Sequence, residues 1–367
     1  MLCSFGAPYV VDAFTYGYVE GVTGYFLSHF HSDHYAGLTR HFRKTIYCTK
    51  ATGNLVQLRL KVESGYLCVL EIERDYELTD GTIVRLLDAN HCPGSVMLLF
   101  RPPNNGPVSL HCGDMRAESC LLNNPSLRKY KVDTLFLDTT YCDPKYEFPS
   151  QEQVIGECLR SLRRELAMAG EKRPALILVG TYTVGKERVA VAIAKEMRVK
   201  IGVSADKKRV LDCLEDAELS RLLTTDLSST NLHMINGRPT EEQLSHRLNA
   251  AAMTDGCGGG KYARMIGVWP SGWEFAMRGA SKPSALVRVR RSGPVTIFGL
   301  PYSEHSSFAE LKAFVQLLRP RHILPTVNWH RRDEMQQKFF QPWLTGKRTV
   351  QLTLTGGQGF FIKSKNR

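Results

Sequence analysis

The sequence predicts an α/β protein in which a second α/β unit interrupts a sheet-rich region. Short β-rich runs separated by Gly, Pro and Asn turns dominate the first 140 residues. Helical periodicity begins after Ser150 and alternates with strands, and strand-forming residues return at 294–298. A chain of 367 residues also exceeds what one hydrophobic core usually serves. We therefore expect two domains, one inserted into the other.

The sheet-rich region contains short runs of β-branched, aromatic and aliphatic residues bounded by turn residues. The strands predicted there are 9–12, 25–28, 84–88, 96–100, 108–111 and 134–137.

The middle of the chain opens with a helix predicted over 151–169. Val154 and Leu159 belong to its apolar face, and Ser150 and Gln153 can form a capping box at its N-terminus. The elements predicted after it are a strand at 175–179, a helix at 186–197, a Gly-rich loop at 256–260, a strand at 294–298, a helix at 307–318 and a strand at 350–354.

Composition and charge indicate which kinds of molecule the protein binds and in which compartment it works. The formal net charge is +12, from 48 Lys and Arg against 36 Asp and Glu, which favours a polyanion. No apolar run reaches the roughly 18 residues of a membrane span, and the N-terminus lacks the pattern of a signal peptide. The 10 cysteines include no Cys-x-x-Cys pair, which favours reduced thiols. We expect a soluble intracellular protein with no membrane partner.

The segment from Ser28 to His34 gives the strongest functional signal. In an extended segment residues i and i+2 point the same way, so His29 and His31 can bind one ion. Asp33 and His34 follow after the chain turns and can face a second ion. Two ions roughly 3.5–4 Å apart are the arrangement used in phosphoester hydrolysis. The alternative is a solvated loop with surface histidines.

Further candidate ligands each follow a predicted strand, where loops would present them on a sheet scaffold. Taken singly, each has an alternative reading as a turn carboxylate or a core histidine. Taken with the His29–His34 segment, they indicate a metal centre. These candidates are His91, Asp114, Asp138 and His305.

The order of these residues resembles a known family. Asp138 and His305 are similar to motifs A and B of the β-CASP nuclease branch of the metallo-β-lactamase fold. The residues similar to motifs one to four of that fold are Asp12, His29, His31, Asp33, His34, His91 and Asp114.

Longer phrases narrow the resemblance to DNA interstrand cross-link repair 5′ exonucleases, the SNM1A/PSO2 type. The implied fold is a four-layer αβ/βα metallo-β-lactamase domain, formed by 1–147 and 294–367, with an inserted α/β β-CASP domain at 148–293. The resemblance covers nearly the whole chain. The phrases that carry it are 11–14, 28–38, 87–94, 180–182, 185–187 and 325–328.

The resemblance implies a metal-dependent exonuclease that degrades DNA from the 5′ end to 5′-mononucleotides in cross-link repair, in the nucleus. It implies one tight Zn²⁺ site and a weaker second site for Zn²⁺, Mg²⁺ or Mn²⁺. The tight site would be formed by His29, His31, His91 and Asp114, and the second by Asp33, His34 and the bridging Asp114.

Three further roles follow from the same resemblance and from the chemistry of the residues. Asp12 would orient ligand histidines, which typically donate their remaining N–H to a carboxylate. His305, oriented by Asp138, would protonate the leaving O3′. Ligation of the second metal by His305 is the open alternative.

Val327 bears on the substrate. RNA-processing β-CASP nucleases resemble one another in having a histidine there that completes the second metal site, whereas DNA-directed members look like this chain. The valine therefore implies DNA and weaker second-site binding. The alternatives are an RNA-processing endonuclease of the same fold, a small-molecule metallo-hydrolase and an inactive DNA-binding scaffold.

The segment Gly180–Lys186 matches a phosphate-binding loop of NTPases up to its lysine, but Glu187 replaces the hydroxyl that would hold Mg²⁺. We therefore expect no nucleotide cofactor. A helix N-terminus with free amides and a lysine is still a phosphate site. The residues expected to hold the 5′-terminal phosphate of a single- or double-stranded DNA end are Tyr182, Thr183, Lys186 and Ser303.

Overall fold

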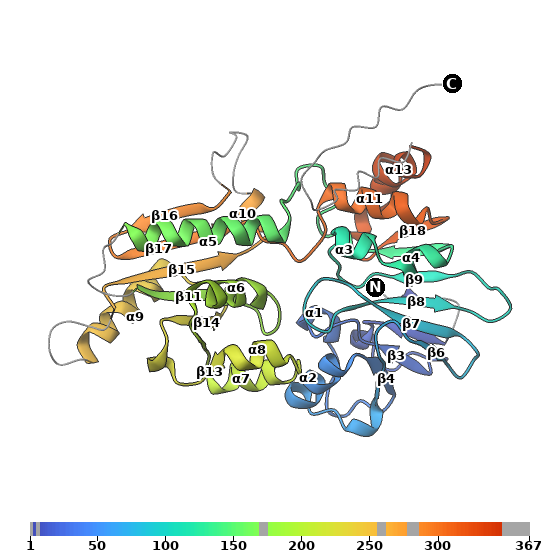
Figure 1. The fold of residues 1–367 in the computed structure, drawn as a ribbon. Coiled ribbons are helices and arrows are strands. Elements are labelled where there is room, and N and C mark those ends of the chain that lie inside the picture. The colour runs from blue at the N-terminus through green and yellow to red at the C-terminus, as the bar shows by residue number, and fades with distance from the viewer. Residues whose placement is uncertain (1–2, 5–7, 169–174, 255–261, 277–285, 347–367) are drawn as a thin grey trace.

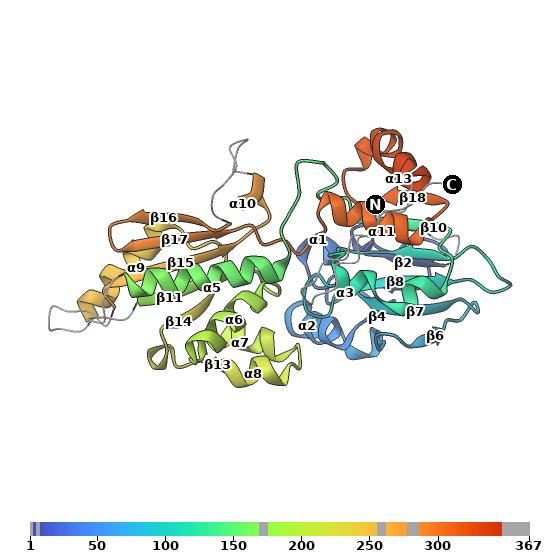
Figure 2. The ribbon, with the colours of Figure 1, turned by 45° about the horizontal axis from the view of Figure 1, so that its top comes forward.

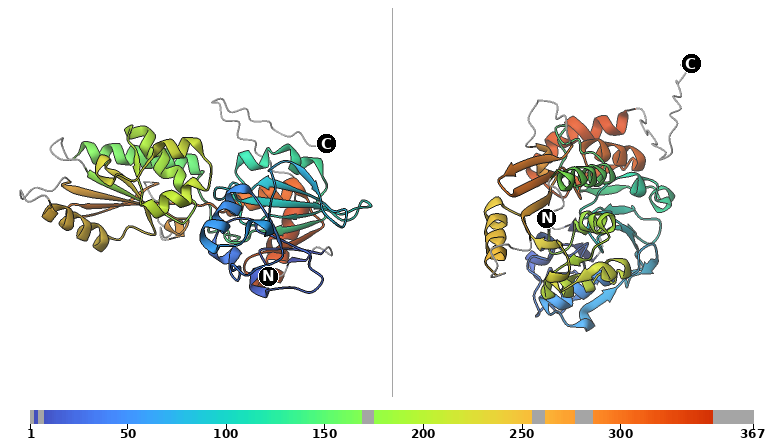
Figure 3. Two further views of the ribbon diagram at one scale, coloured as in Figure 1. Left: turned by 90° about the horizontal axis from the view of Figure 1, so that it is seen from below. Right: turned by 60° about the vertical axis from the view of Figure 1, so that its left-hand side comes forward.

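The structure is a computed structural model, and it describes residues 3–4, 8–168, 175–254, 262–276 and 286–346. Within them the chain forms two lobes that lie side by side (Figure 1). The N-terminal part of the chain and its last described helices form one lobe, and the middle of the chain forms the other. Figure 3 shows the same division from below.

The first lobe contains a mainly parallel five-stranded sheet. Only its edge strand β1 runs antiparallel to its neighbour. In spatial order the strands are β1 (Cys3–Ser4), β2 (Tyr9–Val11), β3 (Gly24–Phe26), β4 (Thr45–Cys48) and β5 (Leu67–Val69).

A six-stranded mixed sheet packs against the first. Its strands β18, β10 and β9 are parallel, and the remaining pairs are antiparallel. In spatial order the strands are β18 (His322–Pro325), β10 (Thr134–Leu137), β9 (Ser109–His111), β8 (Val96–Arg101), β7 (Ile83–Asp88) and β6 (Asp75–Glu77).

This lobe has four layers, in which each sheet packs against the other sheet on one face and against helices on the opposite face. Phe26 and Phe100 are buried between the two sheets, with ring centroids 5.1 Å apart. Leu55 of α2 (Lys50–Leu60) packs against the other face of the five-stranded sheet. Phe314 of α11 (Phe308–Leu318) packs against the other face of the six-stranded sheet. This helix–sheet–sheet–helix order confirms the predicted fold class.

The second lobe is a seven-stranded sheet with helices on both faces. Its strands are parallel except for the edge strand β16. Helices α5 (Gln151–Ala167) and α6 (Glu187–Met197) bury apolar residues against one face, and α9 (Glu241–Thr254) covers the other. In spatial order the strands are β13 (Leu223–Thr224), β12 (Ile201–Gly202), β14 (Leu232–Asn236), β11 (Ala175–Thr181), β15 (Arg264–Pro270), β17 (Val295–Leu300) and β16 (Arg288–Ser292).

Strand β17 pairs with strands of the second lobe, although its residues follow the predicted domain boundary. The strand predicted at 294–298 is present, but it was assigned to the first domain with 294–367. It pairs with β15 and β16, and its six residues are buried on both faces, so it belongs to the sheet of the second lobe. The seven-stranded sheet therefore includes residues up to Leu300.

The local signals placed several helices accurately. The capping box of Ser150 and Gln153 is formed at the start of α5, and Ser307 and Glu310 form a second one at α11. The Gly-rich loop at 256–260 and the strand at 350–354 lie outside the described residues. None of the described helices is long and apolar enough to cross a membrane.

The other helical segments are short. They are α1 (Ser32–Tyr35), α3 (Ser119–Leu122), α4 (Pro125–Lys129), α7 (Ala205–Asp212), α8 (Ala217–Leu222), α10 (Trp273–Ala276), α12 (Arg332–Met335) and α13 (Gln341–Thr345), with single turns at Phe14–Tyr16, Ser64–Tyr66, Leu227–Ser229, Trp329–Arg331 and Gln336–Phe340.

Candidate metal centre and adjoining cavity

The predicted ligands follow strands whose carboxyl ends meet at one end of the sandwich. Asp12 follows β2 and the segment His29–His34 follows the parallel strand β3. His91 follows β7, Asp114 follows β9 and Asp138 follows β10. Because β7 and β9 are both antiparallel to β8, they run in the same direction. Figure 2 shows that this end of the first lobe, marked by α1, faces the second lobe.

Asp12 organises the beginning of the His29–His34 segment. Its backbone has a positive φ of 50°, which turns the chain after β2. The carboxylate of Asp12 accepts hydrogen bonds from the Ser28 amide (2.8 Å), the Ser28 hydroxyl (2.6 Å) and His34 Nδ1 (2.7 Å). His29 Nδ1 lies 2.9 Å from the Ser28 hydroxyl. The Asp12 carboxylate therefore contacts the His34 ring directly and the His29 ring through the Ser28 hydroxyl.

The remaining imidazoles are oriented by groups from more distant parts of the chain. His31 Nε2 donates to the Val184 carbonyl (3.0 Å), which belongs to the second lobe. His91 Nδ1 donates to the carbonyl of Glu304 (2.8 Å). Each ring thereby keeps its proton on the outward nitrogen, and its inward nitrogen carries a lone pair.

The inward nitrogens surround one oxygen, Oδ2 of Asp114. His34 Nε2 lies 3.3 Å from it, and His29 Nε2 and His91 Nε2 each lie 3.7 Å from it. His29 Nε2 is fully buried and has no hydrogen-bond partner among the described residues. His31 Nδ1 and His91 Nε2 approach to 3.1 Å. Two lone pairs at that distance repel unless a cation lies nearby, so the donor set fits a divalent metal.

Electrostatics favour the neutral form at three of the four candidate ligand histidines around the site. Burial lowers the pKa of His29, His31 and His91, which keeps these rings unprotonated. For His34 burial opposes the charge, yet the carboxylates of Asp114 and Asp12 raise its pKa well above the ordinary value. The polypeptide alone thus draws a proton to His34, into a position where a metal ion would supply the positive charge.

The structure brings together most of the expected ligands. Ligand atoms within 4.8 Å of one another come from three overlapping groups: His29, His31, His91 and Cys92; His29, His34 and Asp114; His91, Asp114 and His305. Asp33 is the exception, because its side chain is 77% exposed and its Oδ2 lies 3.7 Å from His34 Nε2. Its role as a ligand stays a prediction.

Cys92 is the residue that sequence reasoning missed. Its thiol is buried beside the ligand His91, and burial raises its pKa well above the ordinary value. Its position directly after His91 was the available signal, but the sequence contains no Cys-x-x-Cys pair that would mark a cysteine as a metal ligand.

Asp138 and His305 form a fixed pair next to the ligands. Asp138 is 1% exposed and accepts hydrogen bonds from the Met115 amide (3.1 Å) and from the amide and hydroxyl of Thr140 (3.0 and 2.7 Å). His305 Nδ1 lies 2.9 Å from Asp138 Oδ2, and His305 Nε2 lies 4.0 Å from Asp114. Although burial opposes it, Asp138 and Asp114 raise the pKa of His305 to about 9. The two carboxylates of the polypeptide therefore favour the protonated form of His305.

A cavity of about 650 Å³ joins the metal centre to the second lobe. Its wall includes Tyr182, Thr183 and Lys186 from the second lobe, and Val327 from the first. Ser303 lines it too, with its hydroxyl bonded to the amide and carbonyl of His305. The residues expected to bind a 5′-phosphate are thus in the same cavity as the metal ligands.

The loop before α6 corrects one expectation. The Gly185 amide donates to both carboxylate oxygens of Glu187 (2.9 and 2.8 Å), and the Lys186 amide donates to Glu304 (2.7 Å). These amides are therefore not free to bind phosphate, because carboxylates already occupy them. The same contacts oppose a bound nucleotide triphosphate.

Side chains give this loop its positive charge instead. Lys186 is 5% exposed, and its ammonium lies 3.6 Å from the ring centroid of Tyr182 and 4.9 Å from that of Trp269. The buried ammonium of Lys207 donates to the carbonyls of Tyr182 (2.6 Å) and Thr183 (2.8 Å), which fixes the loop against the sheet.

Comparison with known proteins agrees with this architecture. A family model described as DNA repair metallo-beta-lactamase matches residues 217–331. A protein of unknown function from Enterococcus faecalis V583 has a similar crystal structure, with a TM-score of 0.53 and 15% identity over 82% of this chain and 74% of that one. The latter supports the fold alone.

Curated relatives match nearly the whole chain. The human DNA cross-link repair 1A protein is 42% identical over 346 residues, which cover 92% of this chain and 31% of that protein. The Arabidopsis thaliana DNA cross-link repair protein SNM1 is 40% identical over 344 residues, 92% of this chain and 68% of that protein. The Gallus gallus 5′ exonuclease Apollo is 29% identical over 337 residues, 92% of this chain and 65% of that protein.

The chain spans about a third of the length of the human, mouse and chicken cross-link repair 1A proteins. It covers two thirds of the plant relative. Its four-layer sandwich carries groups of residues that could hold a metal ion. The chain belongs to the SNM1/PSO2 family of DNA cross-link repair proteins, which have the metallo-β-lactamase fold.

Proposed function

We propose that this chain is a metal-dependent 5′-to-3′ DNA exonuclease that releases 5′-mononucleotides in interstrand cross-link repair. The observation that carries the proposal is the ring of inward imidazole nitrogens around Asp114, each with its other nitrogen bonded outward. The names of the plant cross-link repair relative and of the avian 5′ exonuclease support DNA as the substrate. Activity in DNA repair would place the protein in the nucleus.

The two lobes would form two domains with different roles. We propose that residues up to 147 and from 301 onward form the catalytic metallo-β-lactamase domain, and that the intervening lobe is a β-CASP domain. The support is the sheet topology, because each lobe has its own sheets and its own hydrophobic cores.

The first metal would be held by His29, His31, His91 and Asp114, and fits Zn²⁺ best, because three neutral imidazoles and one carboxylate are a usual zinc donor set. A weaker second ion, Zn²⁺, Mg²⁺ or Mn²⁺, would be held by His34, Asp33 and Asp114. Bound divalent metal supplies Lewis acidity toward the phosphate and an activated water nucleophile.

The protein's own groups would handle the leaving group and the strand end. His305, held by Asp138, would donate a proton from Nε2 to the departing O3′. The ammonium of Lys186 would pair with the 5′-terminal phosphate, and Tyr182, Thr183 and Ser303 would line that subsite. The buried amides of the loop take no part, because carboxylates hold them.

Product analysis tests the proposal. The zinc-loaded chain is expected to release 5′-mononucleotides from 5′-phosphorylated DNA and to degrade the matching RNA far more slowly. His91→Ala should lose the activity and most of the bound zinc, and Asp33→Asn should lose the activity. His322→Ala, at an exposed position outside the cavity, is the matched control. Mononucleotide release by His91→Ala at the wild-type rate would refute the proposal.

A further inference from the structure

Trp273 is a large aromatic side chain that the fold leaves exposed beside the metal centre. It is the first residue of α10 and is 56% exposed. Single exposed hydrophobic residues are common on protein surfaces, so exposure alone carries no argument. The position is what distinguishes it: of the large hydrophobic side chains that the described residues leave exposed, Trp273 and Tyr182 line the 650 Å³ cavity.

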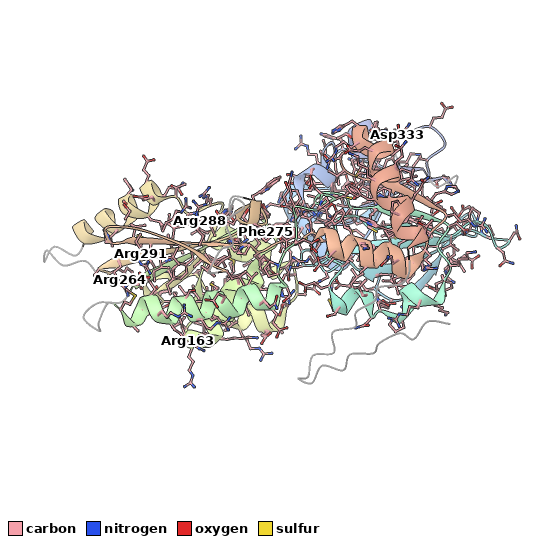
Figure 4. The ribbon with its side chains drawn as sticks, turned by 90° about the horizontal axis from the view of Figure 1, so that it is seen from above. Arg163, Arg264, Phe275, Arg288, Arg291 and Asp333 are labelled. Carbon is pink, nitrogen blue, oxygen red and sulfur yellow. The ribbon has the colours of Figure 1, made fainter. Side chains whose placement is uncertain are left out.

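The ring of Trp273 is held in place by other aromatic rings. It meets Tyr141 edge to face, with centroids 5.6 Å apart, and Tyr146 at 6.2 Å. Its amide donates to the Ser271 hydroxyl (3.3 Å). Figure 4 labels Phe275, two residues further along α10, near the junction of the lobes. A pre-ordered aromatic surface binds with little loss of conformational entropy.

Tyr141 connects this surface to the catalytic pair. Tyr141 is 5% exposed, and its ring centroid lies 5.8 Å from that of His305. Gly272 permits the close approach of α10, because a Cβ there would lie 2.6 Å from the Tyr141 hydroxyl. The buried ring of Tyr141 therefore lies between the exposed ring of Trp273 and the imidazole of His305, and contacts both.

The cavity combines this aromatic surface with positive charge. The ammonium of Lys186 lies against Tyr182 in the same cavity. Proteins that hold single-stranded nucleic acid use this combination, in which cations contact the backbone and aromatic rings stack on bases. A tryptophan that only braced the core would be buried, as Trp343 is at 4% exposure.

We propose that Trp273 stacks on a nucleobase of the strand whose phosphate lies at the metal centre, so that the site takes an unpaired strand end. The inference rests on the proposed nuclease function. Because each base has a π-face, the contact accepts any of the four bases and imposes little sequence preference. Trp273 acts on substrate position, so its loss weakens binding of the strand more than the chemical step.

Strands with single abasic positions test this contact. A 5′-phosphorylated single strand carries one abasic site at the first, second or third nucleotide, and kcat and KM are measured for each. In the wild type, one abasic position is expected to raise KM about tenfold. Trp273→Ala should raise KM for the intact strand by a similar factor and should be insensitive to that abasic position. Trp273→Phe should restore most of the loss.

Trp329→Ala is the matched control, since Trp329 is also exposed (38%) but does not line the cavity. Equal abasic sensitivity of the wild type and Trp273→Ala would overturn the inference, and so would an unchanged KM in Trp273→Ala. If the wild type released no nucleotides, the proposed function would fail instead. Fluorescence anisotropy of a labelled strand in the presence of EDTA would then still report whether Trp273→Ala binds the strand about tenfold more weakly.

Discussion

An imidazole can offer a lone pair to a metal only when its other nitrogen holds the proton, and each ligand histidine of this site has a specific acceptor for that proton. The acceptors differ: the Asp12 carboxylate for His34, and main-chain carbonyls for His31 and His91. The sequence pattern identified the rings and Asp12. It had no means of identifying the carbonyls, because every residue has one.

Removing the Asp12 carboxylate is expected to weaken metal binding without removing a ligand. Asp12→Ala leaves His34 Nδ1 and the Ser28 hydroxyl without their acceptor, so both rings lose their fixed orientation. Zinc affinity should fall by roughly 10–100-fold. Competition with a chromogenic chelator measures it. Asp333→Asn is the control, as Asp333 is 85% exposed and lies at the periphery of the first lobe in Figure 4. Equal zinc affinity in both variants would contradict the orienting role.

Asp138→Asn separates proton donation from metal binding. The amide cannot hold a charged His305, so the acid needed for the leaving group is lost while the three ligand imidazoles remain. The expected result is a fall in kcat of roughly 10²–10⁴-fold with zinc content unchanged. Metal analysis and single-turnover kinetics on the same preparation measure both. A loss of zinc in parallel with activity would assign His305 to the metal instead.

Lys186→Ala should abolish the preference for a 5′-phosphate over a 5′-hydroxyl end. The lysine carries the positive charge of that subsite, since the neighbouring amides are bonded to Glu187 and Glu304. The ratio of cleavage rates on the two ends measures the preference. Lys208→Ala, on an exposed lysine paired with Asp212, is the control. An unchanged ratio in Lys186→Ala would place the phosphate elsewhere.

At the scale of elements, short sequence patterns predicted where helices begin and end, but they did not predict which sheet a strand joins. The predicted cap of Ser150 and Gln153 marked the start of α5, because capping depends on residues three apart. The strand at 294–298 was recognised from its β-branched and aromatic residues, but its sheet was not. Sheet membership depends on pairing with β15, which lies some thirty residues earlier. The exposure of Asp33 and the closeness of Cys92 to the candidate ligand histidines also depend on the whole fold.

Ser150→Ala tests the importance of the cap at α5. The serine side chain accepts from the Gln153 amide (3.1 Å), and Gln153 bonds back to the Ser150 amide (3.1 Å). Loss of this reciprocal pair should reduce the free energy of unfolding by about 1 kcal/mol. Urea denaturation followed by circular dichroism measures it. Ser150→Asp retains a capping side chain and should lose far less.

At the scale of the molecule, metal binding and folding of the first lobe are linked, because the ligands come from the ends of strands in both sheets. Removing zinc leaves converging lone pairs and buried unpaired nitrogens. At a free zinc concentration about 1,000 times the Kd, chelation should cost roughly 4 kcal/mol, which lowers Tm by about 10 °C. Differential scanning calorimetry with and without EDTA measures the shift. An equal Tm in both samples would contradict a resident metal.

The hydrogen bond from His31 to the Val184 carbonyl makes the second lobe a participant in the metal site of the first. For a metal bound at the proposed site, affinity and lobe docking would be thermodynamically reciprocal: contacts that draw the lobes together would strengthen metal binding, and the bound metal would stabilise lobe docking to the same degree. A strand that contacts both lobes would increase metal occupancy as it binds. The metal site would then be most fully occupied, and the two lobes most tightly docked, when the strand is bound.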